Sequence, residues 1–419
     1  MTDKFLIKGE NHLSGEVEIA GYKNSAGVCL AAALLSEKPS IIDNLPHVGD
    51  VSDQIEILKE MGANTEWIGE RKLKISTEKI NPEKIPVNLF EKMRVSVLLI
   101  GPLLARFKKL RVPHPGGDKI GLRPITIHLE ALRNFGIKIR EEGGFYIFEA
   151  PEEIIGKRII LKEFSVTATE NLMMLASLSR GKTKIELAAA EPQVQDLGFF
   201  LRKMGVNVEG IGTHTVSIEG KEKLEGVEFK ICPDLLEAGT FLIAFAITRG
   251  KGKIKNVNPE HLTMFLEKMK EIGVSFETFP GEISIKPSNN FKPTKIQILP
   301  YPGFPTDLQP QTSVLLTQAE GKSIIQEPLY ENRFQYLHEL RKMGADIEIT
   351  DPHRALILGK KELIGNKINA LDIRSGAALI LAGLIAKGET LIENISQIER
   401  GHEKIEEKLT KLGALITKS

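Results

Sequence analysis

Six copies of one local pattern run through the chain and constrain its fold more than any other feature. Each copy is the end of an amphipathic helix, then a glycine, then the alternating residues of a strand, as in LKEMGANTEW (58–67) and LRKMGADIEI (340–349). The six glycines lie 68 to 74 residues apart: Gly62, Gly136, Gly205, Gly273, Gly344 and Gly413. Glycine at this position predicts a helix C-cap, because it adopts the left-handed backbone conformation without a Cβ penalty.

A second pattern in the same units is an apolar helix followed by a turn and a strand, as in LAAALLSEKPSIIDN, FLIAFAITRGKGKIKN and LILAGLIAKGETLIEN. Helices that are apolar on most faces belong to a core rather than to a surface. In the second unit Gly101-Pro102 interrupts the equivalent segment. We therefore expect an α/β fold of six units packed as two groups of three, with a boundary near residue 230. A cleft between the two groups is the default ligand site.

Charge and cysteine content exclude several classes of function. Lys+Arg is 56 and Asp+Glu is 55, which argues against a dedicated nucleic-acid binder. Cys29 and Cys232 are far apart in sequence, so they form neither a disulfide framework nor a zinc knuckle, and they fit a reducing compartment. No pair of histidines has close metal-ligand spacing, so we expect no metal site. We also expect no cofactor.

The chain start, MTDKFLIKGE, lacks the apolar segment of a signal peptide. The longest apolar run, 377–386, is shorter than the roughly 20 residues that span a bilayer. We expect a cytoplasmic protein with no membrane partner and no nucleic-acid partner. The sequence does not determine its oligomeric state.

A short polar segment precedes each buried helix. These segments are GYKNSAG (21–27), KMRVS (92–96), SVTATEN (165–171), PDLLEAG (233–239), PTDLQ (305–309) and DIRSGA (372–377). Helix capping is one explanation for four of their residues: Asn24, Ser165, Asp307 and Ser375. Capping does not explain Lys23, Arg94 and Arg374, because the helix dipole disfavours cations at a helix start. That mismatch favours an anionic ligand.

The loop VPHPGGDKIGLRP (112–124) is a second candidate site. Three prolines frame three glycines, and the loop carries His114, Asp118, Lys119 and Arg123. Its glycines offer unshielded backbone N–H groups, which suits a lid over phosphates. A solvated surface loop is the alternative.

Seven motifs together resemble the enolpyruvyl transferases from end to end: GYKNSAG, MRVSVLLIGPLLAR, PGGDKIGLRP, SVTATENLM, FPTDLQPQ, YENRF and ERGHEKIEEKL. The resemblance implies a two-domain, inside-out α/β barrel of six βαβαββ-type repeats, three in each domain. It also implies domain boundaries at 22–232, with 112–124 as a mobile loop, and at 1–21 plus 233–419. The active site would lie in the interdomain cleft.

The activity that the resemblance implies is transfer of enolpyruvyl from phosphoenolpyruvate to the 3-hydroxyl of UDP-N-acetylglucosamine. The reaction proceeds by addition and elimination, releases phosphate and begins peptidoglycan synthesis. Two alternatives stay open: the sister enzyme that uses shikimate 3-phosphate, and a non-catalytic sensor of the nucleotide sugar.

Residue roles follow from the same resemblance. Asp118 stands where most members have cysteine, and it would protonate the vinyl carbon if closure of the site raises its pKa. Without a thiolate to alkylate, the epoxide fosfomycin should not inactivate the protein. Asp307 matches the base for the sugar hydroxyl. The cations that grip phosphoenolpyruvate would be Lys23, Arg123 and Arg400.

Other positions match substrate contacts. Arg94, Arg333, Asp372 and Arg374 match active-site residues. The nucleotide-sugar contacts would be Asn24, Arg123, Pro124, Ile125, Thr126, Ile127, Glu163, Phe164, Ser165, Val166, Asp307 and Leu329. Two further departures are Thr167, where glycine is common, and Leu235, where arginine is common.

Overall fold

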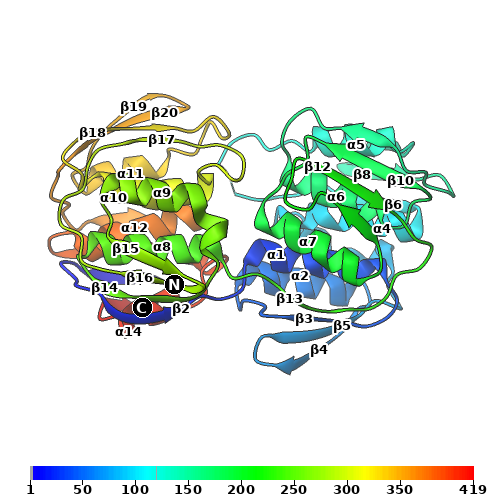
Figure 1. The fold of residues 1–419 in the computed structure, drawn as a ribbon, viewed down its shortest axis with the longest axis horizontal. Helices are drawn as coiled ribbons and strands as arrows, with labels where there is room; N and C mark the ends of the chain where they lie inside the picture. The colour runs from blue at the N-terminus through cyan, green and yellow to red at the C-terminus, as the bar shows by residue number, and fades with distance from the viewer. Residues whose placement is uncertain (1–2, 119) are drawn as a thin grey trace. The chain divides into compact units, whose positions relative to one another are not determined.

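The computed structural model describes residues 3–118 and 120–419, and the chain divides into two compact units (Figure 1). The N-terminal unit comprises residues 21–118 and 123–232. The C-terminal unit comprises residues 3–20, 120–122 and 233–419.

The N-terminal unit contains these strands: β3 (Ser40–Asp43), β4 (Asn64–Gly69), β5 (Lys72–Ser76), β6 (Lys109–Pro113), β7 (Lys138–Glu142), β8 (Phe145–Glu149), β9 (Arg158–Ile160), β10 (Lys182–Glu186), β11 (Asn207–Glu209), β12 (Thr215–Glu219) and β13 (Glu228–Lys230). Its α-helices are α1 (Lys23–Ala32), α2 (Gly49–Glu60), α3 (Val87–Phe90), α4 (Ile100–Phe107), α5 (Thr126–Asn134), α6 (Val166–Ala176) and α7 (Pro192–Lys203). Its 3-10 helices are η1 (Ala33–Leu35), η2 (Pro82–Lys84) and η3 (Val95–Leu99).

The C-terminal unit contains these strands: β1 (Phe5–Lys8), β2 (Ser14–Glu18), β14 (Lys251–Val257), β15 (Phe276–Phe279), β16 (Gly281–Ile285), β17 (Lys295–Gln297), β18 (Gly321–Gln326), β19 (Asp346–Asp351), β20 (Arg354–Gly359), β21 (Lys367–Asn369), β22 (Glu389–Glu393) and β23 (Leu415–Lys418). Its α-helices are α8 (Leu235–Ile247), α9 (Thr263–Ile272), α10 (Gln309–Leu316), α11 (Tyr336–Lys342), α12 (Ile373–Ile385), α13 (Ser396–Glu399) and α14 (Ile405–Lys411). Its 3-10 helices are η4 (Pro259–Leu262) and η5 (Thr306–Leu308).

The repeat is clearest in the sheet β11-β12-β10-β9. Its strands and helices follow the chain order β9-α6-β10-α7-β11-β12. Strands β9 and β10 are parallel, with Ile159 opposite Ile185, and the other pairs are antiparallel. This repeat therefore has the predicted βαβαββ order.

At residues 20–21 and 232–233 the chain passes from one unit to the other, and the strand before each of these points pairs within its own unit. Strand β2 pairs in parallel with β14, and the chain then enters α1 of the N-terminal unit. Strand β13 pairs in parallel with β3, and the chain then enters α8 of the C-terminal unit. Strand β1 lies between β22 and β23 and completes the sheet of the last repeat. The described residues of the second repeat form a shorter sheet of three strands, β6-β8-β7.

Buried helices form the core of each unit, with the sheets outside them. Helices α1 and α7, and α4 and α6, pack together in the N-terminal unit, and α12 packs against α8 and α10 in the C-terminal unit. All residues of α8 are buried. The six repeat glycines all have positive φ, from 87° at Gly136 to 105° at Gly62, which confirms the predicted left-handed position at the helix ends.

Candidate functional site

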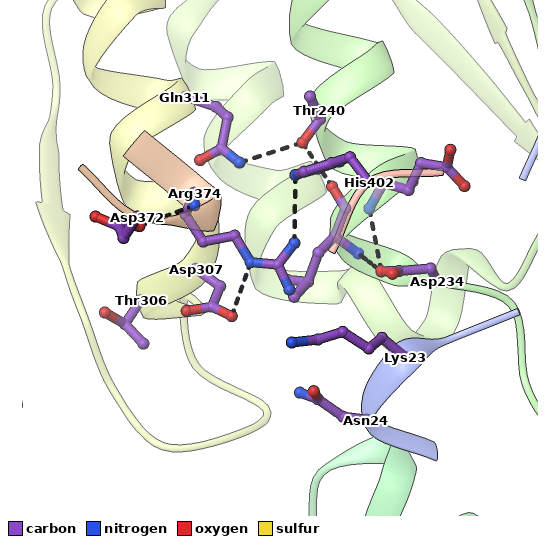
Figure 2. Close-up of polar contacts among 12 residues, drawn as sticks. Lys23, Asn24, Asp234, Thr240, Thr306, Asp307, Gln311, Asp372, Arg374 and His402 are labelled. Atoms are coloured by element: carbon purple, nitrogen blue, oxygen red, sulfur yellow. Dashed lines mark hydrogen bonds and ion pairs between the residues drawn. The ribbon is translucent and has the colours of Figure 1, made fainter. Parts of the chain in front are cut away.

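An aspartate held by two buried arginines is the main polar feature of the C-terminal unit. Asp307 lies in η5, just before α10. Its Oδ1 accepts a hydrogen bond from Arg333 Nη2 at 2.8 Å. Its Oδ2 accepts one from Arg374 Nε at 3.1 Å (Figure 2). The arginine side chains are 2% and 4% exposed, whereas that of Asp307 is 28% exposed. Two buried guanidinium groups thus orient the carboxylate, and part of its surface is exposed to solvent.

Arg333 remains a cation in spite of its burial. Burial opposes its charge, but the nearby carboxylates, Asp307 first among them, outweigh this effect and raise the pKa of Arg333 above its ordinary value. Glu327, in the same region, is a fully buried carboxylate. It accepts hydrogen bonds from Thr306 Oγ1 at 2.6 Å and from the backbone of Leu329 at 3.0 Å. Burial raises its pKa.

The prediction that Asp307 caps a helix is wrong. Pro305 is the N-cap of η5 and makes no side-chain cap, while the two arginines engage the Asp307 carboxylate. The same prediction is wrong for Asn24. Helix α1 begins without a side-chain cap after Tyr22, and Asn24 Nδ2 donates to the Tyr22 hydroxyl at 2.9 Å.

Capping is observed at two other predicted helix starts. Ser165 caps α6 as expected. At α12 the cap is Asp372, whose Oδ1 accepts from the backbone of Arg374 at 2.8 Å, and Ser375 closes a capping box with it. Ser375 is therefore the N3 partner rather than the cap.

Two residues of the C-terminal unit join this cluster without having been predicted. His402 Nε2 lies 3.4 Å from Arg374 Nη1, and His402 is buried. Asp234 caps α8, and burial raises its pKa to about 6, an effect that Arg374 partly opposes. His402 stands two residues after Arg400 in the motif ERGHEKIEEKL, and only Arg400 of this motif had been assigned a role. Arg400 follows α13 and donates through Nη1 to Gln397 Oε1 at 2.9 Å.

In the N-terminal unit, Lys23 is the first residue of α1 and pairs with Asp50 at 2.8 Å. Arg94 reaches the end of the 112–124 loop, where it donates to the carbonyls of Arg123 and Pro124. Asp118 lies in this loop and is half-buried. Lys119 lies outside the described residues.

The three cations predicted at helix starts all have partners within their own units. Lys23 and Arg374 each meet a carboxylate, and Arg94 meets two backbone carbonyls. Partners within each unit therefore account for these cations at helix starts, where the helix dipole disfavours them. Their presence by itself no longer requires an anionic ligand.

The tip of the loop, 120–122, belongs to the C-terminal unit. The backbone N–H of Leu122 donates to Glu331 Oε1 at 2.6 Å, and that of Asn332 donates to the carbonyl of Ile120 at 3.2 Å. The hydrogen bond from Leu122 lowers the pKa of Glu331. These two hydrogen bonds connect residues 120–122 of the motif PGGDKIGLRP with Glu331 and Asn332 of the motif YENRF.

The positions predicted to contact a nucleotide sugar lie mainly at two helix starts of the N-terminal unit. Residues 123–127 lead into α5, and residues 163–166 lead into α6. His128 Nε2 and Thr167 Oγ1, 2.8 Å apart, join the two starts. Burial, with a smaller contribution from Arg94, lowers the pKa of His128 to about 3, so the imidazole is neutral. Leu329 lies in the C-terminal unit and is exposed.

Two absences concern the described residues only. Within 3–118 and 120–419, no three His, Cys, Asp or Glu side chains gather where they could hold a metal ion. Over the same ranges, each helix is too short or too polar to cross a bilayer.

The fold and the sequence define the class of protein. The family described as EPSP synthase (3-phosphoshikimate 1-carboxyvinyltransferase) matches residues 7–409. The chain therefore belongs to this family of enolpyruvyl transferases, and the predicted family is confirmed.

Particular relatives are similar over almost their whole length. The chain is 44% identical to a UDP-N-acetylglucosamine 1-carboxyvinyltransferase of Hydrogenovibrio crunogenus, over 99% of both proteins. It is 43% identical to the protein of the same name from Thermotoga maritima, over 99% of this chain and 98% of that protein.

Solved structures show the same fold. The enolpyruvyl transferase NikO from Streptomyces tendae has a TM-score of 0.90 at 24% identity and covers 100% of this chain and 99% of its own. EPSP synthase from Acinetobacter baumannii has a TM-score of 0.76 at 19% identity, over 100% of both chains. The predicted fold class is therefore confirmed.

Proposed function

We propose that this enolpyruvyl transferase moves the enolpyruvyl group of phosphoenolpyruvate to the 3-hydroxyl of UDP-N-acetylglucosamine and releases phosphate. The observation that carries the proposal is the Asp307 carboxylate, held by two buried arginines, in a chain that aligns end to end with relatives named for this activity. The reaction would begin peptidoglycan synthesis. A cytoplasmic location accords with the two free cysteines.

The chemistry has two stages. In the addition, the sugar hydroxyl oxygen bonds to C2 of phosphoenolpyruvate and C3 gains a proton. In the elimination, C3 gives up a proton, the C2–O bond to phosphate breaks, and the carbon–carbon double bond is restored. An acid above C3 and a base beside the hydroxyl supply these proton transfers.

Asp307 is the proposed base. Arg333 and Arg374 fix its carboxylate plane through hydrogen bonds to different oxygens, and its exposed surface leaves room for a hydroxyl. Asp118 is the proposed acid, in the position where most members have a cysteine. Lys23, Arg123 and Arg400 are the proposed cations for the phosphate and carboxylate of phosphoenolpyruvate.

The remaining substrate contacts are proposed as groups. Arg94, Asp372, Arg374 and Arg333 would orient the reacting groups. The nucleotide sugar would contact Asn24, Arg123, Pro124, Ile125, Thr126, Ile127, Glu163, Phe164, Ser165, Val166 and Leu329. The hydrogen bond between His128 and Thr167 supports a common site for two of these segments, because it joins their helix starts.

The experiment that tests this proposal measures phosphate released from phosphoenolpyruvate with UDP-N-acetylglucosamine, with shikimate 3-phosphate, and with neither acceptor. Release with the nucleotide sugar alone is the expected result. Release with shikimate 3-phosphate alone would assign the protein to the sister activity. Tight binding of the nucleotide sugar with no release would assign it to the sensor class.

A further inference from the structure

The guanidinium of Arg374 meets two different side chains in the C-terminal unit. Its Nε donates to Asp307 Oδ2 at 3.1 Å, and its Nη1 lies 3.4 Å from His402 Nε2 (Figure 2). Both Arg374 and His402 are 3% exposed or less. A cation this deeply buried is stable only with hydrogen-bond partners of suitable geometry.

The chemistry of the two groups determines the direction of the second contact. A guanidinium carries N–H donors and no acceptor. His402 Nε2 must therefore present its lone pair to Arg374, with the imidazole proton on Nδ1. A proton on Nε2 would set two N–H donors against each other, and in the doubly protonated imidazolium it would also oppose two positive charges.

The neighbouring elements show why this contact matters for Arg374. Its backbone is fixed at the start of α12 by the Asp372 cap. Its guanidinium lies at the far end of a long side chain, and Asp234, the N-cap of the neighbouring helix α8, also attracts it. An acceptor on His402 opposes rotation of the guanidinium away from Asp307. Figure 2 shows Arg374 with Asp307 on one side and His402 on the other.

We propose that His402 is a positioning residue that acts through Arg374 to hold Asp307 in its productive orientation. The imidazole contributes as a neutral acceptor in the Nδ1–H tautomer. This inference rests on the proposed role of Asp307 as the base, so its test includes one measurement that does not depend on activity.

The first measurement is nitrogen NMR of the full-length protein labelled with 15N-histidine, with H402Q as the variant that identifies the His402 signals. The expected result is a neutral ring with the proton on Nδ1 and an unprotonated Nε2. An Nε2–H tautomer would overturn the proposal, whether or not the protein is active.

The second measurement compares H402Q with H402F in the phosphate-release assay. Glutamine can still offer an oxygen acceptor to Arg374, whereas phenylalanine keeps a planar ring without one. Losing a hydrogen bond to a charged group is expected to lower kcat about 10- to 100-fold in H402F. We expect H402Q to stay within about threefold of wild type, and KM for both substrates to change by less than about threefold in either variant.

Three results would contradict the proposal: wild-type kcat in H402F, equal loss of kcat in H402F and H402Q, or a loss confined to KM. Thermal unfolding of both variants identifies a failure to fold, and the tautomer of the wild-type protein keeps the test decisive if H402F does not fold. An inactive wild type would count against the proposed function alone, and the tautomer would still decide the role of His402 toward Arg374.

Discussion

Lys23 Nζ lies 2.8 Å from Asp50 Oδ2, in an ion pair that joins the start of α1 to the first turn of α2. The Lys23 side chain is 15% exposed and that of Asp50 is 8% exposed. The pair is therefore far less screened by solvent than an ordinary surface ion pair. Asp50 fixes the ammonium group that we propose to grip phosphoenolpyruvate.

Replacing Asp50 with asparagine tests this relationship. In D50N the amide still accepts a hydrogen bond, but the buried ammonium loses its counter-charge, so we expect a loss of about 1–3 kcal/mol in unfolding free energy. Urea denaturation measures it. D53N is the matched control on the same helix, because its partner Lys92 is 51% exposed and the expected loss is below about 1 kcal/mol. Equal losses in the two variants would contradict the argument.

The sequence predicted the repeat because its signals are local. A glycine that follows an amphipathic helix is expected to end it in the left-handed conformation, and Gly62 and Gly413 have the positive φ that this local pattern predicts. The insertion of β1 between β22 and β23 depends on pairing Phe5 with Ile392 and Lys418. Only the family resemblance indicated that the N-terminal strand belongs to the C-terminal unit, because no periodicity within residues 5–8 identifies pairing partners near the other end of the chain.

The candidate site was predictable as a set of residues but not as a set of contacts. Polar segments before buried helices identified Lys23 and Arg374. The carboxylates that stabilise these cations at helix starts lie 27 and 67 residues away in the sequence. Capping by Asp307 was a reasonable prediction for a polar residue before a helix, but two arginines from elsewhere in the fold engage its carboxylate. Tertiary pairing of this kind leaves no trace in local spacing.

Removing the carboxylate of Asp307 should abolish most of the activity. A positioned general base contributes about 10²–10⁴-fold, so we expect D307N to lower kcat by at least about 100-fold. Phosphate release with UDP-N-acetylglucosamine and phosphoenolpyruvate measures the effect. D346N is a suitable control, because Asp346 is half-exposed and its partner Lys361 lies 3.6 Å away. A D307N variant with near-wild-type kcat would remove Asp307 from the proposed mechanism.

Asp118 should make the protein insensitive to an epoxide inhibitor. A carboxylate is a much weaker nucleophile than a thiolate, so fosfomycin should cause no time-dependent inactivation of the wild type. D118C should gain that inactivation, and D118N should lose about 10²–10⁴-fold in kcat because the acid is removed. Preincubation with fosfomycin followed by the phosphate-release assay tests all three proteins. Rapid inactivation of the wild type would contradict the expectation for the drug, and an active D118N would contradict the role as acid.

Asp234 should make stability fall as pH rises through a defined range. Burial raises its pKa to about 6 in the folded state, against the ordinary value of 3.8. Between these two values the folded state binds more protons than the unfolded state, so the free energy of unfolding decreases with increasing pH, by about 2–3 kcal/mol in total. Asparagine caps helices about as well as aspartate does, so D234N removes the titration and keeps the cap.

Urea midpoints of the two proteins at pH 4.5 and 7 measure the difference, and we expect wild type to lose stability relative to D234N between these pH values. A constant difference would mean that Arg374 and the backbone N–H groups of Leu236 and Glu237 stabilise the ionised carboxylate enough to cancel the effect of burial.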